Sequence, residues 1–145
     1  MNASGARLDR PSPEVLRLLP HVQPPPAKVL VVGGSGHEAR ALDARGYDVT
    51  VLDTSGGDGV LPVLEVELGA TDFGGRFDLV CQAASPRVPT AAHVAAAARA
   101  LRPGGQLFGA FPSDASALLH VVSPHFDVVR SVPVGDVLEV VLRRR

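Results

Sequence analysis

The sequence predicts a three-layer α/β fold with a mostly parallel sheet and an antiparallel hairpin at its C-terminal end. A fully apolar run, Val29–Val32, is typical of a central parallel strand that helices cover on both faces. Turns rich in glycine or proline separate this run from segments that alternate between helical and strand patterns. The last two strand-like segments, 126–132 and 137–142, are linked by only four residues, which permits a hairpin and excludes a parallel crossover.

Length and composition limit the classes of protein to consider. The 145 residues suffice for one domain. Fourteen Lys and Arg against fifteen Asp and Glu give a net charge of −1, so no overall basic field attracts nucleic acid or an anionic membrane. The single cysteine, Cys81, excludes an internal disulfide and fits a reducing compartment. We therefore expect a cytoplasmic protein without nucleic-acid, membrane or metal partners, and the abundance of Ala, Arg, Gly, Val and Pro favours a bacterial source.

The first 26 residues are predicted to form an N-terminal segment, and residues 27–145 the main domain. Within the segment, Ser12 can cap a short helix that begins at Pro13 and ends before Pro20, with an apolar face of one valine and three leucines. The residues that follow, 21–26, include three consecutive prolines and predict an extended connector.

A strand–turn–helix–strand unit comes next. The strand over 28–32 leads into the turn Gly33–Gly36; a helix over 37–45 follows, which Gly46 ends, and 47–53 reads as the second strand. The remaining predicted elements are, in chain order, a strand over 63–68, a strand over 77–83, a helix from Thr90 to Leu101 that Pro103–Gly105 terminates, a strand over 106–111, and a helix capped by Ser113 and running to about Val122.

The connections around the strand at 63–68 are short. Only nine residues separate it from the strand before it and eight from the strand after it, whereas a parallel crossover normally takes about a dozen or more. We therefore expect the helices after the second and third strands to be missing or reduced to turns. Cys81 falls in a buried strand, where a cysteine commonly packs as a small apolar residue.

The turn Gly33, Gly34, Ser35, Gly36 has a direct chemical interpretation. Glycines let the backbone approach a ligand closely, and the following helix offers unpaired N–H groups to an anionic group. Asp53 lies seventeen residues after Gly36, at the end of the next strand, where a carboxylate can accept both hydroxyls of a ribose. The alternative is a glycine-rich turn with a helix-capping aspartate and no ligand.

From Ala27 to Arg143 the sequence resembles the class I S-adenosylmethionine-dependent methyltransferases. The resemblance rests on GGSGHEARALDARGYDVTVLD, on FDLVCQAAS, on LRPGG before QLFGAF, and on the terminal hairpin. It implies the Rossmann-like methyltransferase fold, with S-adenosylmethionine as cofactor. By this resemblance Gly34 and Gly36 would face the methionine part, Asp53 the ribose, and Asp72 or its neighbour Thr71 the adenine. Residues 82–85 would border the methyl group. The full set assigned to the cofactor is Gly33, Gly34, Ser35, Gly36, Asp53, Thr54, Thr71, Asp72 and Gln82.

Two residues depart from the family's glycine motif. Leu30 stands where an acidic residue is usual, and Val32 stands at the first glycine, unless the alignment slips to Gly33. Histidines are the candidate general bases because imidazole titrates near neutral pH. His21, on the connector, and His37, beside the glycine turn, are the best placed; His93, His120 and His125 are the others.

These observations support methyl transfer to a small-molecule acceptor. A second hypothesis is a methyltransferase-like domain without methyl transfer activity, serving as a binding or assembly module or catalysing a cofactor-independent step. A nicotinamide-binding oxidoreductase fragment is the third, supported only by the glycine turn and Asp53. Since so short a chain has little to cover a site, either the N-terminal segment or a second subunit would have to exclude water, and a homodimer is one way to do so.

Overall fold

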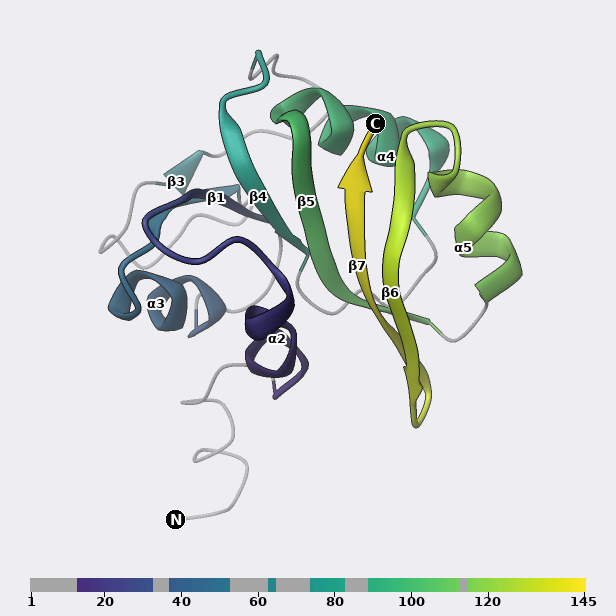
Figure 1. Ribbon diagram of the computed structural model, residues 1–145, viewed down its shortest axis with the longest axis horizontal. Coiled ribbons are helices and arrows are strands. Elements are labelled where there is room, and N and C mark those ends of the chain that lie inside the picture. The colour runs from purple at the N-terminus through teal and green to yellow at the C-terminus, as the bar shows by residue number, and fades with distance from the viewer. Residues whose placement is uncertain (1–12, 33–36, 53–62, 65–73, 83–88, 113–114) are drawn as a thin grey trace.

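The computed structural model describes residues 13–32, 37–52, 63–64, 74–82, 89–112 and 115–145 (Figure 1). The helical elements are α2 (Pro13–Leu18), the 3-10 turn η1 (Leu19–His21), α3 (His37–Ala44), α4 (Ala91–Ala100) and α5 (Ala115–Val122). The strands are β1 (Lys28–Val32), β2 (Asp48–Leu52), β3 (Val63–Leu64), β4 (Phe77–Gln82), β5 (Leu101–Pro112), β6 (Phe126–Val134) and β7 (Val137–Arg144).

The strands form one seven-stranded sheet in the order β3-β2-β1-β4-β5-β7-β6. Strands β1 to β5 run parallel, whereas β7 pairs antiparallel with β5 and β6 pairs antiparallel with β7. The apolar run predicted as a central strand is β1, which pairs with β2 on one side and β4 on the other. The predicted architecture is therefore confirmed.

Two apolar layers sandwich the sheet, one on each face. On the face that carries α2 and α3, the odd-numbered residues of β1 pack with Leu42, Leu79 and Phe108. On the face that carries α4 and α5, the even-numbered residues of β1 pack with Val80, Leu107 and the alanines of α4. We call these the α3 face and the α4 face. This division explains why β1 carries apolar residues without alternation.

The N-terminal segment shares this core. Leu18 and Val22 are buried on the α3 face, next to Phe108 and Val141 of β5 and β7. Figure 1 shows α2 near the end of the sheet where the β6–β7 hairpin turns. The short helix predicted before Pro20 is confirmed, since α2 ends at Leu18 and continues as η1.

The boundary between α4 and β5 differs from the prediction. The helix ends at Ala100 instead of Leu101, and Pro103–Gly105 lies inside β5 instead of before it. Leu101 is fully buried and pairs with Phe77, after which a bulge delays the next pair, Leu79 with Gln106. The strand therefore begins as soon as the helix ends, because long-range pairing takes over from the local turn signal.

Other boundaries lie close to the prediction. Gly46, with φ of +95°, follows α3 as the expected left-handed cap. The terminal hairpin turns through Gly135 and Asp136 alone, because β6 extends to Val134, so the predicted four-residue link is shorter. The strand predicted over 63–68 is present at 63–64, parallel to β2. The predicted loss of helices after the second and third strands concerns 53–62 and 65–73, outside the described residues.

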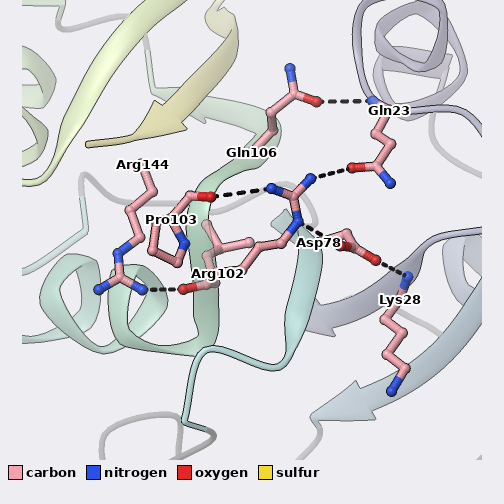
Figure 2. Close-up of polar contacts among 8 residues, drawn as sticks. Gln23, Lys28, Asp78, Arg102, Pro103, Gln106 and Arg144 are labelled. Atoms are coloured by element: carbon pink, nitrogen blue, oxygen red, sulfur yellow. Dashed lines mark hydrogen bonds and ion pairs between the residues drawn. The ribbon is translucent and has the colours of Figure 1, made fainter.

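A polar network ties the connector to the amino ends of β4 and β5 (Figure 2). Arg102 donates from Nε to Asp78 Oδ1 (2.7 Å) and from Nη2 to Gln23 Oε1 (2.7 Å). The backbone N–H of Lys28 donates to Asp78 Oδ2 (2.9 Å), and that of Gln23 donates to Gln106 Oε1 (2.9 Å). Arg102 therefore links β5 to both β4 and the connector.

Candidate functional site

Three parallel strands end side by side at one edge of the sheet. Val32, the last residue of β1, pairs with Leu52 and with Gln82. These two residues are the last residues of β2 and β4. In the chain, the glycine turn follows β1 and Asp53 follows β2 directly. Ligands of open α/β sheets bind beyond the carboxyl ends of such strands, where the chain order reverses. We call this the carboxyl edge.

Most residues assigned to the cofactor lie outside the described residues. These are Gly33, Gly34, Ser35, Gly36, Asp53, Thr54, Thr71 and Asp72. Gln82 is described, and it is the last residue of β4, with 8% of its surface exposed. His37 is the first residue of α3, directly after the glycine turn.

His21 lies elsewhere. It is exposed at the end of η1, and its carbonyl accepts a hydrogen bond from Gln106 Nε2 (3.5 Å). Gln106 pairs with Leu79, three residues before Gln82, so its level in the sheet is about 10 Å from the carboxyl edge. The structure therefore does not bring His21 to the edge where the other candidate residues gather.

A different histidine meets Gln82. His93 Nε2 lies 2.9 Å from Gln82 Oε1, within hydrogen-bond distance. His93 belongs to the first turn of α4, and its backbone N–H donates to the hydroxyl of Thr90, the residue that caps the helix (3.1 Å). A helix beginning here was predicted, and the observed cap at Thr90 fixes His93 in its first turn. The sequence alone did not predict that the start of α4 packs beside the end of β4.

The surroundings keep the His93 imidazole neutral. Burial of the half-buried ring lowers the pKa of His93 below its ordinary value. The positive end of the α4 dipole acts in the same direction. Since the Gln82 amide oxygen can only accept a hydrogen bond, Nε2 carries the ring proton and Nδ1 carries the lone pair.

Close packing fixes the end of β4. Gly109 of β5 pairs with Gln82, and a Cβ placed on Gly109 would lie only 2.2 Å from the Gln82 carbonyl oxygen. The glycine therefore lets β5 approach β4 more closely than any other residue would allow at this position. This contact fixes the backbone of Gln82, and therefore the position from which its side chain reaches His93.

The two residues that depart from the glycine motif are part of the core. Leu30 is fully buried and Val32 is 9% exposed, and both belong to the apolar layer on the α4 face. In the first turn of α3, just past the glycine turn, Glu38 is only 5% exposed. Buried acidic and amide groups thus flank the end of β1, while the β1 residues themselves serve packing.

A buried carboxylate on the α3 face anchors α2. Glu139 of β7 is 4% exposed, and Arg17 Nε donates to both of its oxygens, at 3.3 Å and 3.1 Å. Glu139 pairs with Ala110, the neighbour of Gly109, so this ion pair lies at the level of the carboxyl edge. The N-terminal helix is therefore fastened at the end of the sheet where the candidate site lies.

Two other kinds of structural feature are absent from the described residues. No group of three or more His, Cys, Asp or Glu side chains there is arranged to hold a metal ion. In the same part of the chain, no helix is long and apolar enough to cross a membrane.

Comparison with known proteins finds relatives by structure. Neither a protein-family model nor a curated protein sequence matches the chain. The 1,6-didemethyltoxoflavin-N1-methyltransferase of Burkholderia thailandensis, crystallised with its substrate and S-adenosylhomocysteine, matches with a TM-score of 0.78 and 20% identity over 91% of this chain and 76% of that chain. A TehB-like S-adenosylmethionine-dependent methyltransferase of Corynebacterium glutamicum matches with a TM-score of 0.76 and 18% identity, covering 99% and 94%.

A third match is the N-methyltransferase NodS of Bradyrhizobium japonicum, solved with S-adenosylhomocysteine. Its TM-score is 0.71 and its identity 16%, over 99% of this chain and 93% of that chain. All three proteins are methyltransferases, and each matches this chain over at least 91% of its length with a TM-score above 0.7. The fold of this chain is therefore the Rossmann-like fold of the class I methyltransferases, as the sequence predicted.

Proposed function

We propose that the protein is a methyltransferase that uses S-adenosylmethionine and acts on a small-molecule acceptor. The observation that carries the proposal is the alignment of the ends of β1, β2 and β4. In the sequence, the glycine turn follows β1 and Asp53 follows β2. The structural relatives that bind S-adenosylhomocysteine support the choice of cofactor. One relative has a small heterocyclic substrate, and the net charge of −1 offers no field for nucleic acid.

The residue types that follow these strands are suited to such a cofactor. Gly33–Gly36 would hold its methionine part through backbone N–H groups at the start of α3, and Asp53 would accept hydrogen bonds from its ribose hydroxyls. Gln82, a buried amide at the end of an otherwise apolar strand, would lie beside the sulfonium end. When bound, S-adenosylmethionine supplies an electrophilic methyl group, and the chain's task is to orient the acceptor and to exclude water.

Binding of the demethylated product tests this proposal. We expect calorimetric titration with S-adenosylhomocysteine to show binding, with no binding of NADH. Asp53→Ala should abolish the binding because the ribose loses its acceptor, whereas Asp48→Ala, an exposed residue at the other end of β2, should leave it unchanged. If neither nucleotide binds, the methyltransferase proposal is wrong, and a methyltransferase-like binding module becomes the better explanation.

A further inference from the structure

We propose that His93 is the general base of the reaction and that Gln82 is the residue that positions it, so that the acceptor is a compound that loses an O–H or N–H proton on methylation. This inference rests on the proposed function and deepens it by naming the class of acceptor. Three arguments support it: the location of His93, the chemistry of its ring nitrogens, and the lack of another titratable group at this position among the described residues that pack around it.

The location follows from the fold. Gln82 ends β4, next to the ends of β1 and β2, and its side chain lies on the α4 face of the sheet. His93 reaches this point from the first turn of α4, because Thr90 caps that helix and alanines pack it closely against the sheet. The imidazole is thus held at the carboxyl edge by one hydrogen bond to a side chain that is itself buried.

The protonation state suits a base. Gln82 fixes the proton on Nε2, and the burial that lowers the pKa of His93 leaves Nδ1 free of a proton at neutral pH. Within the described part of the chain, Nδ1 has no hydrogen-bond partner. A lone pair is therefore available to a ligand, while the rest of the ring is held by the protein.

Among the described residues of the elements that pack around His93, no other titratable group lies at the carboxyl edge. On β4, Asp78 lies at the far end in its ion pair with Arg102, and Cys81 is buried on the α3 face. Arg99 lies in the last turn of α4, and His120 of α5 is exposed. Of the described groups on the elements that pack around His93, only His93 itself contacts the last residue of β4.

The proton balance defines the acceptor. As the acceptor's lone pair forms its bond to the methyl carbon, the carbon–sulfur bond breaks and its electron pair remains on sulfur. The acceptor's O–H or N–H proton moves to Nδ1, and the imidazolium that forms keeps its Nε2–H bond to Gln82 before it releases a proton to solvent. Because burial weakens this base, acidic donors such as phenols and heteroaromatic N–H compounds suit it best.

Nuclear magnetic resonance of the ring nitrogens of the ligand-free protein gives a test that needs no acceptor. We expect His93 to be neutral at neutral pH with its proton on Nε2, and to titrate below the ordinary range for histidine. Gln82→Glu should raise the His93 pKa, because a carboxylate stabilises the imidazolium. His120→Gln serves as the control and should leave the His93 signals unchanged. A proton on Nδ1 in the wild-type protein would overturn the proposal.

Turnover provides the second test, with phenols and heteroaromatic N–H compounds as probes and thiols and sulfides for comparison. We expect His93→Gln to keep S-adenosylhomocysteine binding but to lower kcat by about a hundredfold or more. The wild-type rate should rise with pH through the His93 pKa, and Gln82→Glu should move that midpoint upward. Unchanged turnover in His93→Gln, or methylation confined to thiols and sulfides, would refute the inference while leaving the proposed function intact.

Discussion

At position 109 the sheet has room for a hydrogen atom only. Gly109→Ala places a Cβ against the Gln82 carbonyl oxygen, and because that atom belongs to the backbone of β4, the strands must move apart. We expect a loss of about 1–3 kcal/mol in the free energy of unfolding, measured by denaturant titration. The same substitution should disturb the ring-nitrogen signals of His93.

Gly135→Ala provides the matched comparison. Its Cβ would meet nothing within 4 Å, and its cost comes from the φ of +59° alone. We expect a loss of about 1 kcal/mol with unchanged His93 signals. Equal effects of the two substitutions on His93 would contradict the proposed link between Gly109, Gln82 and the imidazole.

Asp78 makes stability depend on pH in the acid range. Partial burial raises the pKa of Asp78, but the hydrogen bonds from Lys28 N–H and Arg102 and their charges outweigh it, so the pKa lies below its ordinary value. A lowered folded-state pKa means that the stabilisation is complete above the unfolded value of about 3.9 and is lost as pH falls through the folded value. We expect Asp78→Asn to abolish this loss of stability at acid pH, measured as the free energy of unfolding at a series of pH values. Arg102→Gln should reduce the loss only in part, because the hydrogen bond from the Lys28 N–H remains.

At the scale of elements, the Arg17–Glu139 pair controls the docking of α2. Arg17→Ala removes the guanidinium that pairs with Glu139, so the buried carboxylate of Glu139 loses this partner. We expect amide hydrogen exchange to speed up in residues 16–22 and the free energy of unfolding to fall by about 1–3 kcal/mol. Arg45→Ala removes an exposed guanidinium whose hydrogen bond within the described residues goes to the carbonyl of Ala41, far from α2 in the sequence, and it should change neither quantity. Unaltered exchange in Arg17→Ala would show that apolar contacts alone hold α2.

The elements themselves were largely predictable, since their signals are local. The apolar run of β1, the left-handed glycine after α3 and the short final link each act within a few residues of the chain. The start of β5 was missed because it depends on pairing with Phe77, far away in sequence. For the same reason the contact between His93 and Gln82 was not predicted, because nothing local in the sequence reveals that the Thr90 cap and β4 bring the two side chains together.

At the scale of the whole molecule, Cys81 reports on global unfolding. Its side chain is fully buried in the middle of the sheet, so a thiol reagent reaches it only after the sheet opens. We expect its labelling rate to follow the rate of global unfolding, and S-adenosylhomocysteine to slow labelling because it binds only the folded state. The product should have no such effect on Asp53→Ala. Labelling that is faster than unfolding would mean that the centre of the sheet opens locally.

The shape of the outer strand has a further consequence for the protein in concentrated solution. β6 is the last strand of the sheet and exposes Val128 and Val129, a combination that invites the addition of another chain. Its ladder of backbone groups is interrupted, however, because Val129 is an extra residue at a bulge and Pro133 has no N–H to donate. These two interruptions disfavour the pairing of another chain with β6, and in this way they protect this side of the sheet against fibrous aggregation.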